Sequence, residues 1–246
     1  MQVADEVFAF TATDVNFALL RDGDDLTLVD GGYPGDLARV EAAVRSLGHS
    51  PEDVRAILVT HAHVDHLGGA RRWHEVHGTP LLTGRDEVAH VRRDYLEQLT
   101  PGRLVANLTH RGMLGWTSRI VRAGALRDAG VRDVQPAADG VPLDVPGRPV
   151  PVATPGHTSG HTAYHLPDAG VVVTGDALVT GHTLSRDIGP QLLPAFFNHD
   201  ESAMLTALDV LGGLDGDCIL PGHGRPWHGS LREAADRARA TATGRR

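Results

Sequence analysis

One short stretch constrains the fold more than any other, because it places three histidines and an aspartate within six residues. It reads His61-Ala62-His63-Val64-Asp65-His66. Imidazole and carboxylate are ligands of borderline divalent metals, zinc first, with iron or manganese as alternatives. The residues just before it, 54–59, are apolar and β-branched and predict a buried strand. The metal-competent side chains are therefore expected where a strand ends.

The residues after this motif predict a helix. Apolar residues recur at helical spacing over 67–77, so the motif is expected in a strand-to-helix turn, where open sheets bind their ligands. Side chains alternate along an extended chain, so the first three ligands of the motif would face one side and His66 the other. One segment can then serve two neighbouring metal ions.

Three other apolar runs end with a glycine directly before a metal-competent side chain. Glycine permits a tight turn and a close approach of the backbone, which places each side chain at the carboxyl end of a strand. The side chains are His157, Asp176 and His223, after strands expected near 150–153, 171–174 and 218–220. Four strand ends would thus converge on one site.

The rest of the chain predicts a single domain over residues 1–246. Segments 86–132 carry helical patterns and no strand pattern, which predicts a helical insertion that acts as a substrate lid or only as a layer over the sheet. Apolar residues that can line an acyl pocket are Tyr95, Leu99, Leu114, Trp116, Phe196 and Phe197. Strands of an antiparallel meander are expected at 7–10, 15–20 and 26–29, and covering helices at 36–47, 203–211 and 231–240.

Composition excludes several classes of function. All 23 basic residues are arginines, which removes Schiff-base lysine chemistry, and the formal charge of −8 argues against a nucleic-acid partner. The one cysteine, Cys218, lies in an apolar run and is expected to be a buried, inert thiol. The sequence has neither an 18-residue apolar run nor a secretory pattern, so we expect no membrane partner and a cytoplasmic location.

The other polar candidates have supporting or surface roles. Asp30 is expected to accept a hydrogen bond from a metal-bound imidazole, and His161 to support the site rather than to be a further ligand. His182, His199 and His228 follow ligand-bearing segments and are candidates for lining the pocket. Surface positions are expected for His49, His74, His77 and His110.

Together these motifs resemble those of the metallo-β-lactamase-fold hydrolase superfamily. The matching segments, in the order typical of the family, are 61–66, 154–158, 175–176 and 221–223. The resemblance implies an α/β fold of four layers, an αβ/βα sandwich of two mixed sheets with helices on both outer faces. It also implies a dinuclear centre in which Asp176 bridges the two ions. In members that look like this, the equivalents of His61, His63 and His157 hold one metal, and those of Asp65, His66 and His223 hold the other.

The implied function is hydrolysis of a small activated acyl compound, a thioester, lactone or ester, by a metal-bridging hydroxide. Two zinc ions are expected, and Asp65 would orient the water or carry its proton. The alternatives are a β-lactamase, a mononuclear-iron enzyme that uses oxygen, and a non-catalytic metal-binding domain. Many β-lactamases of the family carry Cys or Ser where Asp176 stands, and acylhomoserine lactonases carry Tyr where Val179 stands. Neither the oligomeric state nor the acyl compound follows from the sequence.

Overall fold

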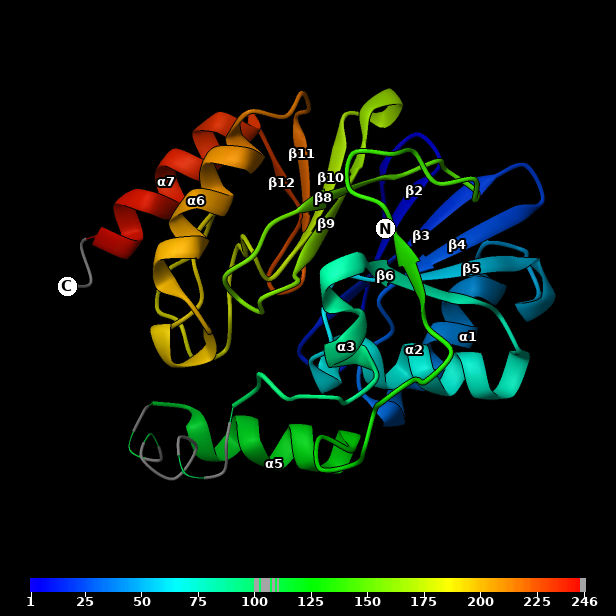
Figure 1. The fold of residues 1–246 in the computed structure, drawn as a ribbon, viewed down its shortest axis with the longest axis horizontal. Coiled ribbons are helices and arrows are strands. Elements are labelled where there is room, and N and C mark those ends of the chain that lie inside the picture. The colour runs from blue at the N-terminus through cyan, green and yellow to red at the C-terminus, as the bar shows by residue number, and fades with distance from the viewer. Residues whose placement is uncertain (100–101, 103–106, 108, 110, 244–246) are drawn as a thin grey trace.

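Two mixed β-sheets pack face to face, and helices cover the outer face of each (Figure 1). The computed structural model describes residues 1–99, 102, 107, 109 and 111–243. This arrangement confirms the predicted four-layer α/β sandwich.

The first sheet is an antiparallel meander extended by parallel strands. β2, β3 and β4 pair antiparallel, as predicted, β1 adds a further antiparallel strand that was not predicted, and β4 to β7 pair parallel. Its strands are β1 (Gln2–Ala4), β2 (Val7–Thr11), β3 (Asn16–Asp22), β4 (Asp25–Val29), β5 (Val54–Val59), β6 (Leu81–Gly84) and β7 (Gln135–Ala137). The helices packed on its outer face are α1 (Leu37–Ser46) and α2 (Val64–His77).

Successive side chains along these strands point alternately to the helices on one face and to the second sheet on the other. Leu19 and Leu28 pack in the core beneath α1 and α2, whereas their neighbours Leu20 and Val29 pack against the second sheet. All four side chains are fully buried. Strands buried on both faces read as continuous apolar runs, which is the pattern seen in the sequence.

The second sheet has the order β12-β11-β10-β9-β8. Its strands are β8 (Val150–Ala153), β9 (Thr162–Leu166), β10 (Val171–Gly175), β11 (Cys218–Pro221) and β12 (Trp227–His228). β9 is antiparallel to both β8 and β10, and β10 is parallel to β11, so β8, β10 and β11 run in one direction. The covering helices are α6 (Glu201–Gly212) and α7 (Leu231–Thr243). Cys218 is buried, as expected, and packs in the core between the two sheets.

The predicted helical insertion contains α3 (Val88–Val91) and α5 (Met113–Ala123) in the described part of the chain. α5 runs along one edge of the molecule, beneath both sheets in Figure 1. Residues 100, 101, 103–106, 108 and 110 lie outside the described residues, so the surface position of His110 stays a prediction. Short 3-10 helices lie at Pro34–Asp36, Pro51–Asp53, Arg85–Glu87, Pro167–Ala169 and Ala195–Phe197.

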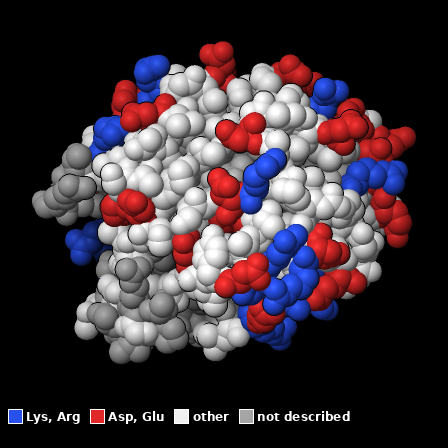
Figure 2. Space-filling view, viewed as in Figure 1, with Lys and Arg blue, Asp and Glu red and all other residues white. Residues whose placement is uncertain are grey.

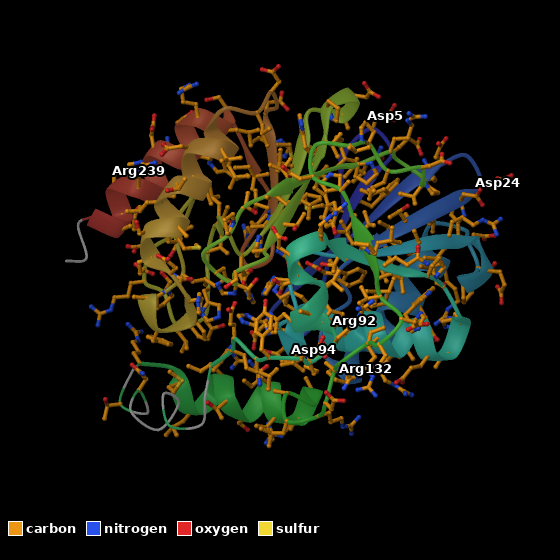
Figure 3. All side chains as sticks on the ribbon, viewed as in Figure 1. Asp5, Asp24, Arg92, Asp94, Arg132 and Arg239 are labelled. Carbon is orange, nitrogen blue, oxygen red and sulfur yellow. The ribbon has the colours of Figure 1, made fainter. Side chains whose placement is uncertain are left out.

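The surface carries both signs of charge. On the face drawn in Figure 2, arginines at the lower right are interleaved with acidic side chains. Arg132 and Asp94 form one such pair at 3.1 Å, and Figure 3 labels both. Among the described helices, we find none with the length and apolar character needed to cross a bilayer.

Candidate metal centre

The first sheet delivers four of the predicted ligands, two from a loop and two from a helix. β5 ends at Val59, and His63 is the N-cap of α2, which begins at Val64. Asp65 and His66 therefore lie in the first helical turn, and the predicted extended alternation is wrong. Consecutive side chains on a helix are rotated by about 100°, so the motif still presents ligands in more than one direction.

The second sheet delivers the other three ligands at one of its edges. Asp176 directly follows β10, and His157 and His223 follow β8 and β11. These strands run in one direction, so their carboxyl ends meet at the same edge. Gly175 has a φ of 49°, and a Cβ on Gly222 would lie 2.2 Å from Asp176 Oδ1. The glycines before the ligands thus have the steric role that the sequence suggested.

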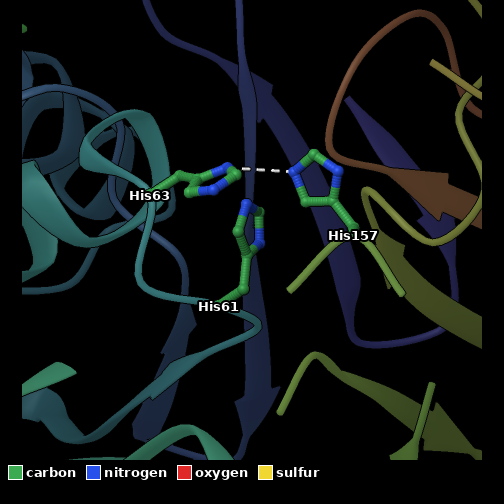
Figure 4. A group of neighbouring side chains, drawn as sticks. All are labelled: His61, His63 and His157. Atoms are coloured by element: carbon green, nitrogen blue, oxygen red, sulfur yellow. Dashed lines mark hydrogen bonds between the residues drawn. The ribbon is translucent and has the colours of Figure 1, made fainter. Parts of the chain in front are cut away.

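The structure brings all seven predicted ligands together. Their donor atoms form three groups, each with all atoms within 4.8 Å of one another. Figure 4 shows three of the imidazoles converging, those of His61 and His63 from the loop after β5 and that of His157 from the turn after β8. The groups are His61, His63 and His157; His61, His66 and Asp176; and Asp65, His66 and His223.

Asp176 lies between the two outer groups. Its Oδ2 is 3.3 Å from Nε2 of His157 and 3.3 Å from Nε2 of His223. Its Oδ1 is 3.5 Å from Nε2 of His66. A carboxylate in this position can offer one oxygen to each of two cations.

Three inward-facing donor atoms have no hydrogen-bond partner. Among the described residues, the buried unpartnered side-chain atoms include His61 Nε2, His66 Nε2 and Asp176 Oδ1. Leaving a buried polar atom unpaired costs about 1 to 3 kcal/mol of folding free energy. A cluster of such atoms therefore indicates a ligand that pairs with them. Nitrogen and carboxylate oxygen at one point are the donor set of divalent metals, and the residues present fit such ions.

The outward nitrogens of three imidazoles in the cluster are held by hydrogen bonds. His66 Nδ1 donates to the Asp30 carboxylate at 2.8 Å, as the sequence predicted for Asp30. His157 Nδ1 lies 3.0 Å from Asn198 Oδ1, and His223 Nδ1 lies 2.7 Å from the main-chain oxygen of Asp14. Such bonds fix the tautomer and ring orientation, so that the other nitrogen faces the centre of the cluster, where a metal would bind.

The chain matches the metallo-beta-lactamase superfamily over residues 10–223. It belongs to that superfamily. A Bacillus subtilis (strain 168) protein named "Probable metallo-hydrolase YflN" is 27% identical over 227 residues, covering 85% of this chain and 81% of that protein. A hydroxyacylglutathione hydrolase from Dechloromonas aromatica (strain RCB) is 29% identical over 203 residues, covering 82% of this chain and 54% of that protein. These similarities support a metal-dependent hydrolase.

Solved structures of the superfamily share the fold. A metallo-beta-lactamase family protein from Thermus thermophilus aligns with a TM-score of 0.73 and 25% identity, covering 99% of this chain and 81% of that one. The Rm3 metallo-beta-lactamase aligns with a TM-score of 0.70 and 17% identity, covering 100% of this chain and 92% of that one. The predicted family resemblance is confirmed.

One residue that supports the candidate site was missed by sequence reasoning. Glu87 is fully buried and accepts the Ala62 N–H at 2.8 Å, between two of the ligands. Its other oxygen accepts the Thr158 hydroxyl at 2.9 Å and the Gly160 N–H at 3.1 Å. Glu87 therefore joins the metal loop to the turn that follows His157.

Glu87 also begins a chain of hydrogen bonds that ends on His63, one of the predicted ligands. His90 Nδ1 lies 2.8 Å from Glu87, and His90 Nε2 accepts the Glu97 N–H at 3.1 Å. The Glu97 main-chain oxygen lies 2.5 Å from His63 Nε2, which leaves His63 Nδ1 facing His157. The start of the helical insertion thus positions part of the metal centre.

Burial and neighbouring charges divide the ligands into two electrostatic classes. Burial and adjacent imidazoles hold the pKa of His61 and of His63 well below the ordinary value. Burial also lowers the pKa of His66, but the carboxylates of Asp30 and Asp176 outweigh it and raise that pKa well above its ordinary value. Neighbouring imidazoles likewise outweigh burial and lower the pKa of Asp176.

The supporting histidines differ in what they contact. His161 Nε2 accepts the Asp176 N–H at 3.1 Å, so it supports the site as an acceptor. Among the predicted pocket residues, the His182 ring centroid is 4.9 Å from that of His223, and His199 Nε2 is 3.6 Å from Glu97 Oε1. His228 is exposed and pairs with Cys218 at the opposite end of β11, so it does not line the site.

Four of the six apolar residues predicted to line an acyl pocket lie together in the structure, and the other two do not. Trp116 packs in a cluster, here called the Trp116 cluster, with Leu99, Phe196 and Phe197 at its border. Leu114 is 70% exposed because it lies on the outer face of α5, and Tyr95 instead stacks on His90. The buried members of the Trp116 cluster are Tyr33, Met113, Trp116, Ile120, Ala123 and Leu184.

Proposed function

We propose that this protein is a dinuclear, zinc-dependent hydrolase of small activated acyl compounds, thioesters or lactones before simple esters. The observation that carries the proposal is the position of Asp176 between two ligand groups, together with the unpartnered inward atoms around it. If the site held a single ion, the donor atoms of one of these two groups would have no metal to bind.

The chain's own residues divide the work at this site. His61, His63 and His157 would hold one ion, and Asp65, His66 and His223 the other. Bound divalent ions supply a hydroxide nucleophile at neutral pH and polarise a carbonyl. Asp65 has a 17% exposed side chain, so its carboxylate can orient a water molecule at the pocket side and hold its proton.

Several features favour a thioester or lactone over a β-lactam. Asp176 stands where many β-lactamases of the family carry Cys or Ser, and the Trp116 cluster offers an apolar surface for an acyl group. A relative is named as a hydroxyacylglutathione hydrolase, and an acylglutathione is a thioester. The chain covers only 54% of that relative, so the proposal does not extend to the glutathione part.

The test compares substrates on one preparation whose zinc content has been measured. We expect kcat/KM to be highest for an acyl thioester or a lactone, lower for a simple ester and lowest for a chromogenic cephalosporin. A cephalosporin value more than about a hundredfold above every other substrate, a gap of roughly 2.7 kcal/mol, would establish the β-lactamase alternative instead.

Elemental analysis separates the proposal from the iron alternative. Two zinc ions per chain with no oxygen consumed during turnover are the expected results. One iron per chain, together with oxygen uptake that matches product formation, would replace the hydrolase proposal with oxygen chemistry.

A further inference from the structure

His182 lies where the metal centre meets the Trp116 cluster. Its ring centroid is 4.9 Å from that of His223, a proposed ligand, and the two rings are perpendicular. On its other side the ring centroids of Phe197 and Trp116 are 5.3 Å and 5.9 Å away. The imidazole therefore contacts both the site and its apolar border.

A backbone contact fixes which nitrogen of His182 carries the proton. The Leu184 N–H donates to Nδ1 at 3.1 Å, so Nδ1 is unprotonated and the proton resides on Nε2. With Nδ1 unprotonated and the proton on Nε2, the ring is neutral. Within the described residues, no protein group accepts a hydrogen bond from Nε2.

We propose that the Nε2–H of His182 donates a hydrogen bond to the carbonyl oxygen of the acyl substrate. This inference rests on the proposed function. The acyl chain would lie against the Trp116 cluster, and the scissile bond would lie at the metal centre. The carbonyl group joins these two parts of the substrate, so its oxygen would lie next to His182. A fixed, neutral donor at that point stabilises the negative charge that develops on the oxygen when the carbonyl is attacked.

Two substitutions at this position separate hydrogen bonding from shape. His182→Phe keeps a flat ring among Trp116 and Phe197 but removes the donor. His182→Gln places an amide N–H near the position of Nε2. His228→Phe is the matched control, because His228 is exposed at the far end of β11. Zinc content is measured for every variant.

The substrates are a pair that differ in one atom. They are the butyryl thioester of N-acetylcysteamine and the butyryl oxygen ester of N-acetylethanolamine. For His182→Phe we expect kcat/KM to fall by roughly ten- to a hundredfold on both, because both share the carbonyl. His182→Gln should recover much of that loss, and His228→Phe should match the wild type.

A binding measurement tests the same contact without turnover. The probes are a ketone analogue, with CH2 in place of the thioester sulfur, and its counterpart that lacks the carbonyl oxygen. Calorimetry on zinc-loaded protein should show that His182→Phe weakens the ketone by about tenfold and leaves the second compound unchanged.

Three results would overturn the assignment. A loss confined to the oxygen ester would place the donor at the leaving group, because sulfur is a poor acceptor. Unchanged kinetics in His182→Phe would remove the contact while leaving the proposed hydrolase intact. A loss of zinc in proportion to activity would make His182 a support for the metal centre. A wild-type protein that cleaves neither compound would instead count against the proposed function itself.

Discussion

Glu87 concentrates four hydrogen bonds on one buried carboxyl group next to the metal loop. Every one of its contacts comes from a donor, so the site requires two acceptor oxygens. Glu87→Gln would turn an N–H group toward another donor at almost unchanged volume. We expect the free energy of unfolding of the metal-free protein to fall by about 2 to 3 kcal/mol, with weaker zinc binding.

Urea unfolding and a competitive zinc titration measure the two effects of Glu87→Gln. The control is Glu75→Gln on the surface of α2, where Arg71 and Arg72 are the partners. Surface pairs contribute about 0 to 1 kcal/mol, so this control should change little. Equal losses in the two variants would contradict a special role for Glu87.

Zinc uptake should release protons, because two of the proposed ligands are charged in the metal-free site. Nearby carboxylates outweigh burial at His66 and His223, and raise the pKa of His223 to about 10. Both imidazoles then hold a proton at pH 7, whereas a metal binds the neutral ring. We expect about two protons released per loaded chain, and zinc affinity that rises with pH through neutrality.

A pH indicator in weakly buffered solution records that release as zinc is added. His223→Gln removes one of the two raised groups, so it should release about one proton fewer. Zinc binding with no change of pH in the wild type would show that the two imidazoles are already neutral.

At the scale of elements, the strand ends were predictable and the helix start was not. A glycine before Asp176 and before His223 marks the end of a buried apolar run, and both residues lie where that pattern predicts. The start of α2 at Val64 lacks the Ser, Thr, Asp or Asn that normally signals an N-cap, because His63 occupies that position.

The supporting bonds were missed for a different reason. The main-chain oxygens of Asp14 and Glu97 accept hydrogen bonds from His223 and His63. Every residue has a main-chain oxygen, so the sequence does not indicate which ones make such contacts. Glu87 and His90 are three residues apart, a spacing that in sequence indicates only neighbours on a helix. Their role depends on a contact with the turn at Gly160, 73 residues from Glu87.

Helix α5 offers a matched pair of positions to test whether the insertion contributes to the substrate pocket. Trp116 is 6% exposed in the Trp116 cluster, and Leu114 is 70% exposed on the opposite side. Trp116→Leu should lower kcat/KM more for octanoyl than for acetyl thioesters, by roughly fourfold for each methylene that loses contact. Leu114→Ala should leave the chain-length dependence unchanged.

Steady-state kinetics over acetyl, butyryl and octanoyl thioesters provide this comparison. If Trp116→Leu lowers all three by the same factor, the helix only supports the fold and the lid interpretation is wrong. If Leu114→Ala alters the dependence as well, the acyl group does not lie where we propose.

At the scale of the whole molecule, the candidate metal centre lies where the two sheets meet and draws residues from both. The loop and helix after β5 supply four proposed ligands, and the ends of β8, β10 and β11 supply three. The core between the sheets is apolar, with Leu58 packed against the strands of the second sheet. The sequence predicted this layering through its family resemblance, whereas one domain over residues 1–246 and a particular oligomeric state stay untested.

Because both sheets supply ligands, metal binding should stabilise the whole fold rather than one loop. An ion that binds only the folded state adds about 4 kcal/mol at a thousand times its Kd. We expect two zinc ions per chain, and a melting temperature that rises with zinc and falls with a chelator. Asp176→Ala should lose most of this gain, since two cations would face each other with less compensating charge.

Mass spectrometry of the intact protein under native conditions and thermal unfolding provide the measurements, with Asp168→Ala as a control. Asp168 lies in the turn Pro167–Ala169, just before β10 and so at the opposite end of that strand from Asp176. Its zinc-dependent gain should equal that of the wild type. The double variant His61→Ala with His63→Ala should bind at most one ion and lose activity. If wild-type protein in excess zinc repeatedly holds one ion, or if Asp176→Ala keeps both ions and the full gain in stability, a bridging Asp176 cannot be correct.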